Sequence, residues 1–72
     1  MIIRRADANK MRKELKAQGY NIKTSTLTNE KVMFNVFQNS QWLFGSDANV
    51  YPKEVLQKHR KAFDITKRYR IR

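Results

Sequence analysis

The sequence predicts a small α+β domain of two layers, in which a helix, a three-stranded antiparallel meander and a second helix precede a basic C-terminal tail or short strand. Apolar side chains recur at helical spacing near both ends of the chain and at strand spacing between them. The length of 72 residues suits one domain, and the absence of Cys leaves the apolar core to hold it together. We therefore expect a single domain over residues 1–64 and a basic arm over residues 65–72.

The first element is expected to be a helix over residues 7–18. This stretch is rich in good helix formers, and Gly19 follows at the position where a positive φ commonly ends a helix. With about 100° between successive residues, Met11 and Leu15 share an apolar stripe, and most of the basic residues lie opposite. Glu14 is expected to pair with Lys10 on the surface of the same helix. The helix thus has a core-facing side and a basic side.

The next elements are expected to be three antiparallel strands joined by tight turns. Polar and apolar residues alternate over residues 20–28, and β-branched and aromatic residues dominate residues 31–38. The turns are expected at residues 29–30 and 39–40, and a short third strand follows at residues 41–44. Because short turns join the strands in sequence, the three strands form a meander.

The strand at residues 31–38 is apolar on both faces, which indicates a central position in the sheet. Val32, Phe34 and Val36 share one face, and Met33 and Phe37 lie on the other. Because the helices of a two-layer fold cover only one face of the sheet, one of these two sets must stay exposed. An exposed apolar patch would suit a protein partner or a homodimer, formed through this face or through an edge strand.

A second helix is expected to begin at Pro52, because Pro is favoured at the first helical position and Glu54 places an acid in the first turn. It is expected to run to about Phe63, again with an apolar and a basic side. Residues 65–72 alternate as a strand would and are strongly basic. We expect a partly ordered arm there, with a short edge strand as the alternative.

The charge of the chain is strongly positive and unevenly distributed. Sixteen Lys and Arg residues against six Asp and Glu residues give a formal net charge of +10. Residues 1–31 hold eight bases and three acids, residues 32–52 hold one acid and no base, and residues 53–72 hold eight bases and two acids. A net charge of about 2 to 8 already keeps a small domain in solution, so the excess predicts a polyanionic partner.

Nucleic acid is the polyanion that a folded basic domain is best suited to bind. We expect a non-enzymatic DNA- or RNA-binding protein, an accessory or regulatory factor that grips phosphates through its basic helix faces and its C-terminal arm. The candidate contact residues are Arg5, Arg12, Lys13, Lys16, Lys53, Arg60, Lys61, Lys67, Arg68, Arg70 and Arg72. The alternative function is a protein-interaction module or small inhibitor whose basic face docks on an acidic protein or nucleoprotein surface.

No motif in the sequence indicates catalysis, a cofactor, a metal or a small-molecule substrate. Gly-rich phosphate loops, paired carboxylates and metal-ligand clusters are all absent from the sequence. His59 is the only His, and no acid or Ser lies at a spacing that would place a catalytic partner beside it. We expect His59 to be a half-buried packing residue, with Tyr51 as its candidate hydrogen-bond neighbour.

The aromatic residues of the strands have two interpretations. Phe34, Phe37, Trp42 and Phe44 are either core residues or a platform on which bases stack. A domain this small needs large apolar side chains for its core, so we expect the core. The apolar helix stripes are needed there too, so no membrane partner is expected. The sequence holds no Cys, no signal-like N-terminal segment and no apolar run of spanning length, and a cytoplasmic setting is therefore expected.

Overall fold

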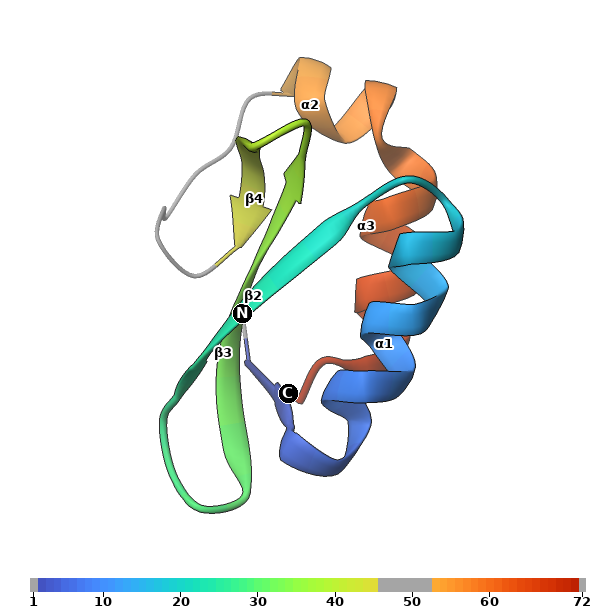
Figure 1. Cartoon of the computed structure of the whole chain (residues 1–72). Coiled ribbons are helices and arrows are strands. Elements are labelled where there is room, and N and C mark those ends of the chain that lie inside the picture. Colours follow the sequence, from blue (N-terminus) through green and yellow to red (C-terminus); the bar gives the residue numbers. More distant parts are fainter. Residues whose placement is uncertain (1, 46–52, 72) are drawn as a thin grey trace.

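A computed structural model describes residues 2–45 and 53–71. The elements are β1 (Ile2–Arg4), α1 (Arg5–Ala17), β2 (Asn21–Thr26), β3 (Lys31–Gln38), β4 (Gln41–Gly45), α2 (Lys53–Lys58) and α3 (Arg60–Tyr69). The strands form one antiparallel sheet, and α1 and α3 pack side by side on one of its faces (Figure 1). The predicted two-layer α+β fold is confirmed.

The strand β3 lies at the centre of the sheet, as its apolar faces predict. Along one edge, residues 32–37 of β3 pair with β2. Along the other edge, residues 31–33 pair with β1 and residues 35–38 pair with β4. The turn between β3 and β4 contains Asn39 and Ser40, whose φ angles of 52° and 65° are both positive, as a type I′ hairpin turn requires.

The short strand β1 is the element that sequence analysis missed. It is three residues long, too short to show an alternating pattern, and α1 follows it immediately at Arg5. The side chain of Ile3 is fully buried in the core. β1 therefore extends the predicted three-stranded sheet to four strands.

The predicted helix end at Gly19 is confirmed. Gly19 has a φ of 89°, which an L-residue with a side chain adopts at a cost. The Gly19 N–H donates to the Lys16 carbonyl at 3.0 Å, and the Tyr20 N–H donates to the Leu15 carbonyl at 2.9 Å. These two bonds form a Schellman motif, which leads the chain out of α1 and into β2.

The second predicted helix is divided in two at His59. Backbone hydrogen bonds continue through the junction, from the His59 N–H to the Val55 carbonyl and from the Phe63 N–H to the His59 carbonyl. The φ and ψ angles of His59 are −116° and 34°, which lie outside the helical range and bend the axis. The predicted start at Pro52 lies outside the described residues.

The structure differs from the expected arm over residues 65–72. Residues 65–69 belong to α3, and Ile65 and Thr66 are buried. After the helix, Arg70 forms a β-bridge with Ile3, and the Ile71 N–H donates to the Ile2 carbonyl at 3.0 Å. The apolar residues of this segment also fit helical spacing, because Ile65 and Tyr69 lie four residues apart.

The core lies between the helices and the inner face of the sheet. The predicted stripe of α1 is buried at Met11 and Leu15, and that of the second helix is buried at Ala62, with Val55 and Phe63 partly buried against the core. Ile65, from the segment expected to be an arm, is also buried on α3. The inner face of the sheet contributes Ile3, Ile22, Val32, Phe34, Val36 and Phe44. On the outer face of β3, Met33 and Phe37 are only partly buried. Tertiary packing thus decides which of the two apolar sets on β3 is buried.

Candidate nucleic-acid interface

The helices α1 and α3 form one layer, joined by the carboxylate of Glu14. Glu14 Oε2 accepts a hydrogen bond from Arg68 Nη2 at 2.6 Å, and its Oε1 accepts one from the Tyr69 hydroxyl at 2.9 Å. The expected pairing of Glu14 with Lys10 is therefore replaced by a pairing between helices. The hydrogen bond to Glu14 also raises the pKa of Tyr69 above its ordinary value of 10.0.

The acidic and the basic side chains of α1 lie on different flanks of the helix. Glu14 lies on the flank next to α3, and Asp7, two turns earlier, lines a cavity with Tyr69. Arg5, Arg12 and Lys16 share the opposite flank, because intervals of seven and four residues return to the same side of a helix. The Arg5 guanidinium donates to Thr26 Oγ1 of β2 at 3.3 Å. The basic flank of α1 therefore lies over the β2 side of the sheet.

Several lysines of the layer have no ion-pair partner among the residues that the structure describes. They are the candidates Lys13, Lys16, Lys61 and Lys67, all of them exposed. Arg60 pairs with Asp64 at 3.4 Å, but side-chain exposures of 74% and 55% leave that pair well solvated. Exposed pairs of this kind contribute little and rearrange at low cost. These side chains are available to a polyanion.

Two candidate residues lie off the surface shared by α1 and α3. Lys53 is on α2, beyond the bend at His59. Arg70 follows the end of α3, and its guanidinium lies 4.8 Å from the centroid of the Phe63 ring. Arg72 lies outside the described residues. The surface of the helical layer is thus built mainly from the candidates on α1 and α3.

Sequence reasoning left Arg4 out of the candidate set. Arg4 comes from β1 and lines a cavity of about 440 Å³ with Arg68 and Arg70 from the opposite end of the chain, beside Asp7. Neither local periodicity nor motif spacing brings residues 4 and 70 together. The signal that was available in the sequence was the Arg4-Arg5 pair at the start of α1.

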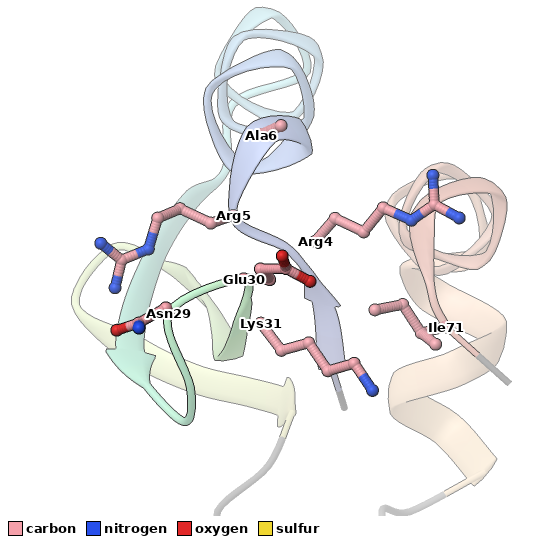
Figure 2. Close-up of a pocket in the computed structure, with 7 residues that line it drawn as sticks. All are labelled: Arg4, Arg5, Ala6, Asn29, Glu30, Lys31 and Ile71. Atoms are coloured by element: carbon pink, nitrogen blue, oxygen red, sulfur yellow. The ribbon is translucent and has the colours of Figure 1, made fainter.

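A second cavity, of about 600 Å³, lies at the start of α1 and is lined by the basic residues Arg4, Arg5 and Lys31 together with Glu30. Figure 2 shows Arg4 and Arg5 pointing to opposite sides of the chain, with the carboxylate of Glu30 between them. A phosphate entering this cavity would meet that carboxylate. The outer surface of the helices is therefore the better candidate for a phosphate site.

The four strand aromatics separate into two pairs. Phe34 and Phe44 are fully buried, as expected of core residues. Phe37 and Trp42 are register partners on the outer face of the sheet, and both are partly exposed. The expectation that all four lie mainly in the core therefore holds for one pair only.

His59 is buried, with 8% of its surface exposed, and its partner is Tyr20. A hydrogen bond of 2.8 Å joins His59 Nδ1 to the Tyr20 hydroxyl, and the two rings meet edge to face. The expected packing role is consistent with this burial, whereas the suggested neighbour Tyr51 lies outside the described residues.

Over residues 2–45 and 53–71, no cluster of three or more His, Asp and Glu side chains is placed to hold a metal ion. No helix in the same ranges is long and apolar enough to cross a membrane. Comparisons with protein-family models, with curated proteins and with solved structures found no match to the chain.

Proposed function

We propose that the chain is a non-enzymatic nucleic-acid-binding protein, an accessory or regulatory factor that captures phosphates on the outer surface of α1 and α3. The observation that carries this proposal is the position of the two helices in one layer. Within them, nine Lys and Arg side chains stand against three Asp and Glu, a net charge of +6. None of the nine is buried, since the core-facing stripes hold only uncharged side chains.

The dimensions of this surface suit a nucleic-acid backbone. A helix of 13 residues, the length of α1, is about 20 Å long, and two adjacent helices together present a surface about 20 Å wide. A duplex carries a phosphate charge every ~1.7 Å along its axis, so a segment of this length offers about 12 phosphates. Neutralising about 6 of them uses most of the cations on the layer.

Two of the three acids in the layer weaken this potential only locally. Glu14 is occupied by Arg68 and Tyr69 between the helices, and Asp64 is paired with Arg60. The lysines of the layer have no ion-pair partner among the described residues. Lysines and arginines of this kind bind phosphates through charge, without reading base sequence, so we propose a mode of binding that depends on charge and shape.

The test is a gel-shift assay on DNA, double-stranded RNA and single strands over a series of salt concentrations. Contact with about 6 phosphates gives a slope of log K against log salt near −5. Each of Lys13→Glu, Lys16→Glu and Lys67→Glu should weaken binding to every polyanion and make the salt slope less steep by about 1.

Lys58→Glu is the matched control, because Lys58 is exposed on α2, outside α1 and α3, and the substitution changes the net charge equally. If Lys58→Glu weakens binding as much as Lys16→Glu does, net charge alone is responsible and the helical surface is not the site. Absence of binding to all three nucleic acids at about 50 mM salt contradicts the function itself. Binding to an acidic protein under the same conditions would then favour the protein-interaction alternative.

A further inference from the structure

We infer that the outer face of the sheet is a second site, which binds the unpaired bases of single-stranded nucleic acid. This face is the one opposite α1 and α3, which lie on one side of the sheet only (Figure 1). Its central residues are Phe37 of β3, Trp42 of β4 and Lys23 of β2. The site is separate from the helical surface and has its own aromatic and basic groups.

Phe37 and Trp42 form a pair that spans two strands. They are register partners on adjacent strands, so their side chains leave the same face of the sheet about 5 Å apart. The indole N–H of Trp42 donates to Asn35 Oδ1 at 3.0 Å. Because Asn35 lies further along β3, this bond draws the indole along the strand. A ring held in this way can offer a flat surface to a base.

A cavity of about 380 Å³ opens beside Phe37, and its lining includes Asn21, Lys23 and Ser40. This volume is within the range of about 300 to 1,000 Å³ of pockets that hold small ligands. The Asn21 amide and the Ser40 hydroxyl both donate and accept hydrogen bonds, as the edge of an unpaired base requires. The cavity thus combines an aromatic wall with polar groups that suit a base.

The charge of this face matches a nucleic-acid strand. The Lys23 ammonium lies over the Phe37 ring, 5.1 Å from its centroid. A base that stacks on this face displaces the flexible lysine side chain, whose ammonium then meets the phosphate of that base. Arg4 and Lys31 are register partners further along the same face. None of the four described strands contains an Asp or a Glu. The carboxylate of Glu30 lies beside Arg4 and Lys31, just before β3 begins, whereas Phe37 and Trp42 meet near the other end of β3. Aromatic rings next to a cation are typical of single-strand sites.

Charge also argues against a second copy of the chain as the occupant. Two copies that meet through this face would each bring a net charge of +10. They would bring the cations of both faces together, and like charges in contact oppose association. A strand of phosphates and bases instead neutralises those cations and covers the aromatic rings.

Fluorescence of Trp42, the only Trp in the chain, provides the test. A short oligothymidylate should quench it in a saturable manner, because a base stacks on or beside the indole. Heparin and a blunt DNA duplex carry charge without unpaired bases, so they should bind the helices and leave the fluorescence unchanged. If oligothymidylate leaves it unchanged as well, the second site is contradicted, whereas gel shifts by the duplex would still support the helical surface.

Two variants locate the site. Phe37→Leu keeps an apolar side chain and removes the ring, and it should weaken single-strand binding by about 5- to 150-fold, the value of one base–aromatic stack. Lys23→Gln is at an exposed position, so it keeps the test valid if Phe37→Leu does not fold, and it should weaken binding to single strands more than to duplex.

Lys58→Gln removes the same charge from α2 and should leave the quenching unchanged. Equal effects of Lys23→Gln and Lys58→Gln would contradict the site. A concentration-dependent dimer that Phe37→Leu dissolves would also contradict it, because it would assign the face to a second copy of the chain.

Discussion

Tyr20 and His59 lie far apart in the sequence and meet inside the core. Their exposed fractions are 9% and 8%, and the hydrogen bond between them satisfies two polar groups that water hardly reaches. His59 also lies at the bend between α2 and α3, so its hydrogen bond to Tyr20 connects this bend to the start of β2. A buried imidazole engaged in this way is suited to a structural role.

We expect Tyr20→Phe to lower the free energy of unfolding by about 1 to 3 kcal/mol, because it leaves His59 Nδ1 buried without its partner. His59→Ala should cost at least as much, since it also opens a cavity. Urea unfolding of both single variants and of the double variant gives the coupling energy, expected at about 0.5 to 3 kcal/mol.

Nucleic-acid binding by His59→Ala, measured where the variant is folded, should equal that of the unchanged protein. Loss of function in a folded His59→Ala variant would instead indicate that the imidazole takes part in chemistry.

At the scale of elements, α1 and α3 are joined by a short polar contact above the apolar core. Both oxygens of Glu14 accept hydrogen bonds from α3, one from Arg68 and one from Tyr69. The contact holds the two basic helices in one layer, and it places a carboxylate between their cations. The proposed phosphate-binding surface and the packing of the helices therefore depend on the same residue.

This contact predicts a dependence of stability on alkaline pH. The hydrogen bond to Glu14 raises the pKa of Tyr69 in the folded chain above 10.0, the value expected in the unfolded chain. The folded state therefore holds the phenolic proton more tightly, and the stabilisation is present below pH 10.0 and is lost as the pH rises through the folded pKa. Glu14→Gln removes the carboxylate charge and brings the Tyr69 pKa back toward its ordinary value.

The free energy of unfolding should consequently fall less above pH 10.0 in Glu14→Gln than in the unchanged protein. Chemical unfolding of both proteins at a series of pH values measures this difference, since the two proteins differ only at residue 14. Parallel pH profiles of the two proteins would show that Tyr69 is not coupled to Glu14.

At the scale of the whole molecule, the two ends of the chain complete the fold together. β1 pairs with the first residues of β3, and residues 70 and 71 then pair with β1 on its other side. Ile3, fully buried, lies between these two pairings. Arg68 and Arg70 are thereby held next to Arg4 rather than extending away from the domain.

Deletion of residues 70–72 should therefore destabilise the domain by about 1 to 3 kcal/mol, because it removes backbone hydrogen bonds and uncovers Ile3. Thermal or urea unfolding measures the loss. The full-length variant with Arg70→Gln and Arg72→Gln is the control for charge, since it keeps the backbone pairing. If the deletion destabilises the domain no more than this control does, the result would favour the partly ordered arm expected from the sequence.

Sequence patterns alone predict the fold class, the central position of β3, the apolar stripe of α1, part of the stripe on the second helix and the end of α1 at Gly19. These features depend on interactions within a few residues, such as the spacing of Met11 and Leu15 or the freedom of a glycine to adopt a positive φ. The basic character of both helices was likewise visible as the charge on the side opposite each stripe.

Which residues from distant parts of the chain meet depends on tertiary packing. It determines which side of β3 faces the helices, and it leaves Phe37 partly exposed beside Trp42. It also pairs Glu14 with Arg68 and brings Tyr20 into contact with His59. Local periodicity is the same whichever face of a strand is buried, and residues 65–69 fit both helical and strand spacing. Packing against α1 and the sheet determines both the buried face of β3 and the conformation of residues 65–69. A helix is formed there because it buries Ile65 and Thr66 in the core while their backbone groups stay hydrogen-bonded.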